Sequence, residues 1–237
     1  MSESVETIEW KALIQQELSK DYMKNLSQHL KRERAAGKTV FPAPNEYFRA
    51  FDLVPFDKVK VVIIGQDPYH DGNANGMAFS CKQKLSPSLR NIKKELQEEY
   101  NLDDATMADR FTDDELNHWA AQGVLLINTC LSVENGNPGS HAGIGWERFT
   151  KTMIDALYND NTPKVFMCWG EHAKKVMQAK SGELHNPMHN ILTSAHPSPF
   201  SAHKGFFGNN HFKLASQYVE KMRDDSEHGI DWFNIPF

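Results

Sequence analysis

The sequence predicts an α/β fold, a single-domain three-layer sandwich in which helices flank a central four-stranded parallel sheet. Four short apolar runs are rich in β-branched residues and suit strands that are covered on both faces. They lie at 61–64, 124–127, 165–168 and 190–195. Amphipathic helical stretches separate these runs, and such alternation of strand and helix is typical of a parallel sheet.

Length and composition fit one globular domain over residues 1–237. With 40% hydrophobic and 24% charged residues, the chain can bury a normal core. Its start is acidic and lacks the apolar core of a signal peptide, and no apolar run approaches the ~20 residues that span a bilayer. We therefore expect an intracellular protein that binds no membrane.

Neither the cysteines nor the histidines predict a metal site. Three cysteines are widely spaced and form no Cys-x-x-Cys pair, which argues against a disulfide framework, an iron–sulfur cluster and structural zinc. They are Cys81, Cys130 and Cys168. His185 and His189 have a metal-like spacing, but Pro187 between them opposes placing both on one helical face. We expect reduced, partly buried thiols and no bound metal.

The net charge of −5 argues mildly against a broad nucleic-acid-binding surface. Phosphates are bound mainly by Lys and Arg, and these number 26 against 31 Asp and Glu. Any contact with DNA must therefore be local.

The first quarter of the chain is expected to support the sheet. Residues 8–35 have apolar side chains at three- and four-residue steps, which predicts one or two amphipathic helices packed on the domain. Residues 32–56 are interrupted by glycine and prolines, yet they contain several aromatic side chains. We expect an ordered connection within the same domain.

The strand at 61–64 ends in a polar cluster, GQDPYH at 65–70. Gly65 permits a sharp exit from the strand, and Pro68 stiffens the turn. The other side chains supply an amide, a carboxylate, an aromatic wall and an imidazole: Gln66, Asp67, Tyr69 and His70. In open parallel sheets, ligands bind at this carboxyl edge, so the cluster is a candidate site. The alternative is an ordinary polar turn after a strand.

A Gly/Asn loop at 71–76 leads to a short strand or turn at 77–80. Ser86, Pro87 and Ser88 then open a helix, because Ser suits the cap and Pro suits the first turn. Ser88 thus lies at a helix N-terminus, where a phosphate can bind. The alternative, an ordinary capping residue, is equally consistent with the local sequence.

The other strands also end in polar groups. A short helix at 113–121 precedes the second strand, which ends at Asn128, and the fourth strand ends at His196. Further helices are expected at 146–158, 171–180 and 211–222. Because parallel strands end at one edge, Asp67, Asn128 and His196 can converge although they are far apart in sequence.

A carboxylate, an amide and an imidazole at one sheet edge fit a hydrolysis. Asp67 can orient water, Asn128 can read a polar heterocycle, and His196 can stabilise the charge of a leaving group. A serine hydrolase is less attractive because the sequence has no Gly-x-Ser-x-Gly motif. A Gly-rich phosphate-binding loop is also missing.

These residues resemble the uracil-DNA glycosylase family that contains the human and the common bacterial base-excision enzymes. Two signature loops match as they stand, GQDPYH at 65–70 and HPSP at 196–199. Other segments match in order: GMAFS at 76–80, GVLLINT at 123–129, GWE at 145–147, WG at 169–170 and GFFG at 205–208. The resemblance extends from about residue 41 to residue 232.

The resemblance implies a hydrolase that flips uracil out of the DNA stack and cuts its glycosidic bond without a metal or cofactor. It implies that Asp67 activates water and favours a cationic sugar, and that a neutral His196 donates to the departing uracil. The implied uracil pocket has four residues. Gln66 contacts uracil, Tyr69 excludes the methyl group of thymine, Phe79 stacks on the ring, and Asn128 reads the edge that differs from cytosine.

The resemblance also implies a set of DNA contacts. Three serines would hold backbone phosphates: Ser88, Ser198 and Ser201. Phe200 would enter the vacated stack as a wedge, with Lys204 beside it; the alternative is a Phe200 ring folded back onto 206–207. The chain departs from the family at three positions: Glu171 replaces Ser, Phe200 replaces Leu, and Lys204 replaces Arg and loses its planar fork. None belongs to the implied uracil pocket, so these departures leave the expected substrate class unchanged, and the sequence does not determine their effect on DNA affinity.

The partners that the resemblance implies are uracil-containing single- and double-stranded DNA, replication or repair proteins, and protein inhibitors of the glycosylase. We expect a cytoplasmic monomer, associated with the nucleoid if the source is bacterial. Two alternatives are weighed against this function. A non-catalytic DNA-binding replication accessory protein of the same fold is disfavoured by Asp67 and His196. A glycosylase for another damaged base is disfavoured by Tyr69 and Asn128.

Overall fold

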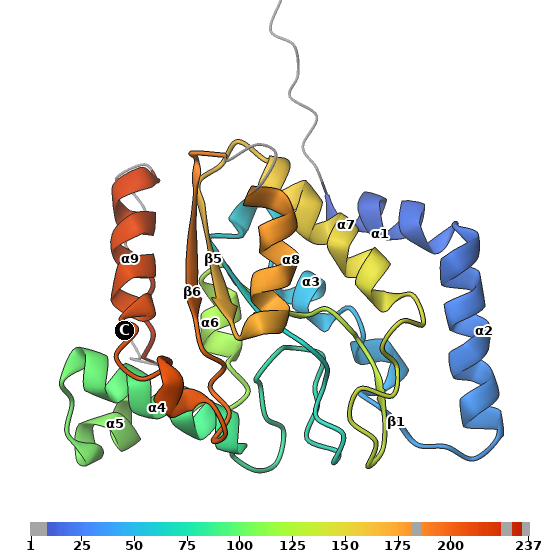
Figure 1. Cartoon of the computed structure of the whole chain (residues 1–237), viewed down its shortest axis with the longest axis horizontal. Coiled ribbons are helices and arrows are strands. Elements are labelled where there is room, and N and C mark those ends of the chain that lie inside the picture. The colour runs from blue at the N-terminus through green and yellow to red at the C-terminus, as the bar shows by residue number, and fades with distance from the viewer. Residues whose placement is uncertain (1–8, 182–185, 224–228, 234–237) are drawn as a thin grey trace, which may run out of the picture.

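The computed structural model describes residues 9–181, 186–223 and 229–233, and it has the expected α/β architecture (Figure 1). A four-stranded parallel sheet has the order β3-β2-β5-β6. Its strands are β2 (Val61–Gly65), β3 (Val124–Asn128), β5 (Lys164–Trp169) and β6 (His189–Ser194). Each begins and ends within one or two residues of the apolar run that predicted it.

Helices cover both faces of this sheet. Figure 1 shows α8 and α9 on opposite sides of β5 and β6. The helices are α1 (Trp10–Leu18), α2 (Asp21–Ala35), α3 (Arg49–Leu53), α4 (Pro87–Tyr100), α5 (Asp104–Arg110), α6 (Asn117–Ala121), α7 (Trp146–Asn159), α8 (Glu171–Ser181) and α9 (His211–Met222). Short 3-10 turns are η1 (Pro44–Glu46), η2 (Phe56–Lys58) and η3 (Ala202–Lys204).

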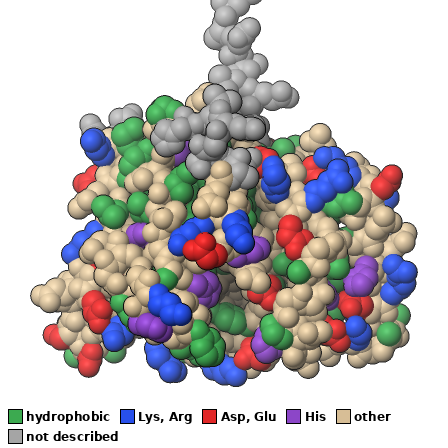
Figure 2. Space-filling model, viewed as in Figure 1, with side chains coloured by type: hydrophobic (Ala, Val, Ile, Leu, Met, Phe, Trp, Pro, Cys, Tyr) green, Lys and Arg blue, Asp and Glu red, His purple; other side chains and the backbone are tan. Residues whose placement is uncertain are grey.

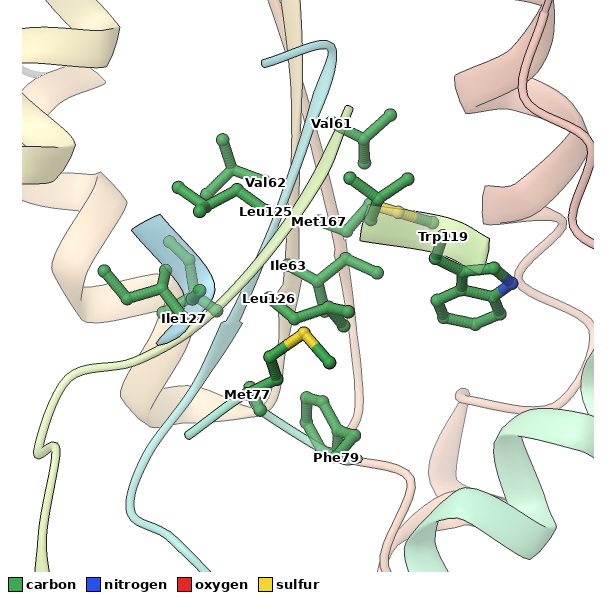
Figure 3. Close-up of a cluster of buried hydrophobic side chains, with 14 of the residues drawn as sticks. Val61, Val62, Ile63, Met77, Phe79, Trp119, Leu125, Leu126, Ile127 and Met167 are labelled. Atoms are coloured by element: carbon green, nitrogen blue, oxygen red, sulfur yellow. The ribbon is translucent and has the colours of Figure 1, made fainter. Parts of the chain in front are cut away.

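The hydrophobic core lies on both faces of the sheet and extends to the carboxyl ends of its strands. Ile63, Leu126 and Met167 come from three strands and have at most 1% exposed surface. Figure 3 shows that Met77 and Phe79 continue this cluster beyond the strands. Because Phe79 also lines the candidate site, the floor of that site is continuous with the core.

One expectation about local structure was wrong in its bounds. The helix expected at 113–121 begins only at Asn117, because Leu116 has a left-handed backbone (φ 55°) that no α-helix continues through. Residues 77–80 form a turn, one of the two alternatives expected there. The sequence reasoning also missed a two-stranded antiparallel pair, β1 (Val40–Phe41) with β4 (Val133–Glu134), since two-residue strands have no periodicity.

The three cysteines are free and buried, which is more complete burial than expected. Burial in apolar surroundings raises the pKa of the Cys130 and Cys168 thiols to about 12. None of the helices in the described part of the chain is long and apolar enough to cross a membrane.

The strand order places a topological switch point between β2 and β5. From β2 the chain proceeds to β3 on one side, and from β5 it proceeds to β6 on the other. The β2–β3 register runs to the pair Gly65 and Asn128, whereas the β2–β5 register ends one pair earlier, at Ile64 and Cys168. Switch points of this kind are where open α/β sheets bind ligands.

Candidate active site

The carboxyl ends of the strands surround a cavity of about 240 Å³. All six side chains of the expected uracil site line it, together with Ser88 from the start of α4. The six are Gln66, Asp67, Tyr69, Phe79, Asn128 and His196. Figure 2 shows the hollow on this face of the molecule, with histidine side chains beside it.

Asp67 is the second residue after β2, and its half-buried carboxylate is held by a backbone group. The amide N–H of Gly139 donates to Asp67 Oδ2 at 2.8 Å. Gly139 lies in the loop between β4 and α7, far from Asp67 in sequence. This hydrogen bond fixes one carboxylate oxygen and leaves the other for a water or a substrate.

His196 follows β6 and is arranged as a neutral hydrogen-bond donor. The backbone N–H of Ser198 donates to His196 Nδ1 at 2.9 Å, so the ring hydrogen of the neutral form lies on Nε2. Burial lowers the pKa of His196, and the nearby Asp67 charge opposes this only in part. A neutral imidazole with Nε2–H therefore lines the cavity.

Two glycines make room for the polar side chains of the site. A β-carbon on Gly65 would lie 2.2 Å from Asn128 Oδ1, so the Asn128 amide can cross the end of β2 only because residue 65 is Gly. Likewise, a β-carbon on Gly170 (φ +92°) would lie 2.9 Å from the β-carbon of His196. Within the described residues, no hydrogen bond engages the Asn128 amide, so it can bind a ligand.

Tyr69 is fixed by the residue that caps α4. The Tyr69 hydroxyl lies 2.6 Å from Ser86 Oγ, which also accepts the N–H of Leu89 at 3.1 Å as the cap of the helix. Burial raises the pKa of Tyr69, so the phenol stays protonated. The ring is therefore a rigid, neutral wall of the cavity.

Phe79 is held by an unusual backbone conformation. Its φ of +63° lies in the left-handed region, which costs free energy for a bulky residue. Its ring centroid lies 5.7 Å from that of His196 and 5.5 Å from that of Trp169. This packing holds the Phe79 ring against the cavity, with 8% of the residue exposed.

The three serines expected at phosphates lie on two adjacent segments. Ser86, and not Ser88, is the cap of α4, which leaves the Ser88 hydroxyl without a capping role at the cavity edge. Ser198 and Ser201 contact each other through their hydroxyl oxygens at 2.9 Å. Asn91 of α4 joins the two segments by donating to the carbonyl oxygen of Pro197 at 2.8 Å.

Phe200 is 86% exposed, and it makes no ring contact with Phe206 or Phe207. The alternative in which this ring folds back is therefore wrong. Lys204 ends the adjacent turn η3. The negative charge that Glu171 brings is partly offset within α8, because the Glu171 carboxylate accepts a hydrogen bond from Lys174 Nζ at 2.8 Å.

Sequence reasoning did not assign several groups that the structure brings to the site. His70 lines the cavity, and its Nδ1 is buried without a hydrogen-bond partner in the described part of the protein. Its place in the cluster at 65–70 was a usable signal. There was no such signal in the sequence for the Gly139 amide, because every residue except proline has a backbone N–H and residue type therefore does not identify a distant backbone donor.

The described residues contain no group of three or more His, Cys, Asp or Glu side chains that could hold a metal ion. His185, one member of the pair with metal-like spacing, lies outside the described residues. The other member, His189, is buried in β6 and contacts the carbonyl oxygen of Tyr158 at 2.9 Å.

Comparisons with known proteins show the family of this chain. A model of the uracil DNA glycosylase superfamily matches residues 51–220. The chain is 47% identical over 229 residues to the uracil-DNA glycosylase of Azotobacter vinelandii, covering 94% of this chain and 92% of that one. It is 46% identical over 226 residues to the uracil-DNA glycosylase of Sinorhizobium medicae, covering 94% and 88%.

Solved structures show the same fold. The crystal structure of mimivirus uracil-DNA glycosylase matches with a TM-score of 0.79 and 27% identity, covering 90% of this chain and 82% of that chain. A mimivirus variant in complex with UGI matches with a TM-score of 0.79 and 28% identity, covering 90% and 84%.

Proposed function

The chain belongs to the uracil-DNA glycosylase superfamily, and from this premise we propose which of its residues perform the reaction. The enzyme hydrolyses the N-glycosidic bond between uracil and deoxyribose in DNA and leaves an abasic site. The observation that supports our assignment best is the pairing, in one cavity, of the Asp67 carboxylate with a neutral His196 that donates from Nε2.

The flipped nucleotide enters the cavity because the bond to be cut is inaccessible inside a duplex. As the bond between the sugar and N1 of uracil breaks, its electron pair goes to the base, and His196 Nε2–H donates to the oxygen where this charge develops. Asp67 stabilises the cationic sugar and accepts the proton of the attacking water. The base leaves as an anion and takes up one proton, and Asp67 releases the proton that it took from water, so the net products are uracil and a sugar that bears a new hydroxyl group.

His70 is a second group that can position this water. It follows Asp67 by three residues, lines the same cavity and has a buried Nδ1 with no hydrogen-bond partner in the described region. A buried polar atom of this kind is satisfied by a bound water or by the substrate.

Selection of uracil rests on the rigidity of the cavity walls. Tyr69, held by Ser86, occupies the space that the methyl group of thymine would need. Asn128, placed by Gly65, presents its amide to the edge of the base that differs between uracil and cytosine. Phe79 stacks on the ring of the base.

Binding of the DNA backbone is local, in keeping with the net charge of −5. The serine hydroxyls at the start of α4 and after His196 lie beside the cavity and suit phosphates on both sides of the flipped nucleotide. Phe200 projects into solvent next to them and fills the vacated position in the stack. The mimivirus relative that binds UGI supports a further proposal, that a protein inhibitor of this kind blocks the same face here.

A direct test incubates the protein with a uracil-containing oligonucleotide in two parallel reactions, with and without a chelator, each followed by alkaline cleavage. We expect strand cleavage at the uracil position and none with a matched thymine oligonucleotide. Intact uracil DNA after prolonged incubation would overturn the assigned activity, and loss of activity in chelator alone would overturn the metal-independent mechanism.

A further inference from the structure

A side chain from the start of α8, the helix that follows β5, reaches the turn after β3. His172 is the second residue of α8, and its Nε2 lies 2.6 Å from Thr129 Oγ1. Thr129 follows Asn128, and its hydroxyl donates to the carbonyl oxygen of Gln66 at 3.0 Å. Two hydrogen bonds in series therefore connect the segments that follow three strands.

The chemistry of the donors gives this link a direction. A threonine hydroxyl has one hydrogen, and in this link it is donated to the Gln66 carbonyl. The oxygen of Thr129 must then accept from His172, so the hydrogen of the imidazole lies on Nε2. The chain of donors runs from His172 through Thr129 to Gln66.

The segments after β2 and β3 are also joined by their backbones. Thr129 N–H donates to the carbonyl of Gly65 at 3.1 Å, and Cys130 N–H donates to the carbonyl of Gln66 at 2.9 Å. These bonds continue the β2–β3 ladder past the last strand residues. The β2–β5 register has ended by this point, at Ile64 and Cys168. The side chain of His172 therefore connects the segment that follows β5 to the Gln66 peptide, through Thr129.

Thr129 is itself held from a third direction. The hydroxyl of Thr150 in α7 donates to the Thr129 carbonyl at 2.8 Å, and Thr129 is only 3% exposed. A hydroxyl on so fixed a backbone can define the position of the groups that it contacts.

We propose that His172 is a positioning residue for base release, acting through the Thr129 hydroxyl on the Gln66 carbonyl. Gln66 and Asp67 share the peptide whose carbonyl is held, so the link fixes the orientation from which the Asp67 carboxylate extends. This inference rests on the proposed roles of Asp67 and the cavity. His172 itself lines a neighbouring cavity of about 250 Å³ with Trp169 and Gly170, and does not line the cavity assigned to uracil.

Because His172 does not line the uracil cavity, its loss should lower kcat and leave KM nearly unchanged. We expect His172→Leu to lower kcat about tenfold, as removal of one oriented hydrogen bond can do. His172→Gln retains a side-chain N–H donor and should recover most of the loss. Thr129→Val should lower kcat at least as much as His172→Leu, and Thr129→Ser should not.

The experiment measures kcat and KM of these variants on one single-stranded uracil oligonucleotide, with melting temperatures recorded in parallel. The matched control is Val176→Ala, one turn further along α8 on a cavity wall that His172 also lines. It removes apolar contacts and no hydrogen bond, so it should lower Tm and leave kcat unchanged. The double variant His172→Leu/Thr129→Val should be no slower than Thr129→Val, since both changes break the same link.

Additive losses in the double variant, or an equal loss of kcat in Val176→Ala, would overturn the proposal. A ¹⁵N-resolved NMR spectrum gives an independent test, because the proposal requires the His172 hydrogen on Nε2; a hydrogen on Nδ1 contradicts it. The activity of the parent protein distinguishes failure of the proposed function from failure of the proposed role of His172. A parent that releases no uracil refutes the proposed function, whereas an active parent with fully active variants refutes only the role of His172.

Discussion

Asn128 Oδ1 occupies the space that a β-carbon on Gly65 would need, at a distance of 2.2 Å. The two residues are paired across β2 and β3, so neither residue can move away from the other without breaking the pairing of the two strands. The amide that faces the base is therefore placed by the absence of a side chain on the neighbouring strand.

Gly65→Ala should displace the Asn128 amide and reduce kcat/KM by about a hundredfold, the effect of a misplacement near 1 Å. The measurement is base release by purified Gly65→Ala, with Tm as a check on folding. In the double variant Gly65→Ala/Asn128→Ala the contact with the amide is gone, so its Tm should exceed that of Gly65→Ala. The remaining contact with the Ala78 β-carbon, at 2.9 Å, prevents full recovery. An active Gly65→Ala single variant contradicts the prediction.

Asp67→Asn should retain the fold and DNA binding but lose most turnover, because water activation and stabilisation of the sugar cation both need the negative charge. His196→Asn should reduce the rate by roughly 10²- to 10³-fold, as removal of an oxyanion donor does. Single-turnover rates and DNA affinities of both variants check this. Parent-like rates in either variant would show that the catalytic residues are assigned wrongly.

Tyr69→Ala should admit thymine, because the wall that excludes its methyl group is removed. Asn128→Asp should admit cytosine, since an acceptor replaces the amide donor of the side chain. Both activities should be weak. The assay is release of labelled thymine or cytosine from otherwise identical oligonucleotides by folded variants. If neither base is released, the model of the pocket is wrong.

Phe200→Ala should weaken productive binding most for duplex uracil and least for single strands, where no neighbouring stack resists extrusion. Stacking of a base on an aromatic ring contributes about 1–3 kcal/mol, so the duplex loss should be at least several-fold. Phe200→Leu should restore much of the duplex activity. The measurement is kcat/KM on matched single- and double-stranded substrates at one salt concentration. Equal losses on both substrates, or no loss, exclude the wedge role.

Glu99 should make the free energy of unfolding depend on pH. Its carboxylate accepts the N–H groups of Phe212 and Lys213 at the start of α9, yet burial raises its pKa from the usual 4.5 to about 7. The folded state therefore binds a proton more tightly than the unfolded state. The contribution of this group to stability is complete below pH 4.5 and is lost as the pH rises to about 7.

Denaturant unfolding at pH 5 and pH 8 measures this effect. The parent should lose more stability between the two values than Glu99→Gln, which has no carboxylate to ionise. An identical pH dependence in parent and variant would show that Glu99 does not titrate in this range.

Local sequence determined most of the secondary structure of this protein. Apolar runs and turn residues predicted all strands of the parallel sheet, and periodicity predicted α9 at its exact bounds, 211–222. These signals suffice because burial on both faces requires continuous apolar residues, and a helix face requires a period of 3.6. The order of strands and helices likewise predicted that Asp67, Asn128 and His196 converge, and they do line one cavity.

Tertiary structure alone decided how those side chains are held. The Gly139 amide on Asp67, the Ser86 hydroxyl on Tyr69 and the His172–Thr129 contact join residues that are 17 to 72 positions apart. A backbone donor has the same chemistry in every sequence, and a hydroxyl or imidazole has no preferred distant partner. Only the packed chain brings these groups within hydrogen-bonding distance. The sequence therefore indicates which chemical groups are present at the strand ends, while the fold sets the orientation in which they act.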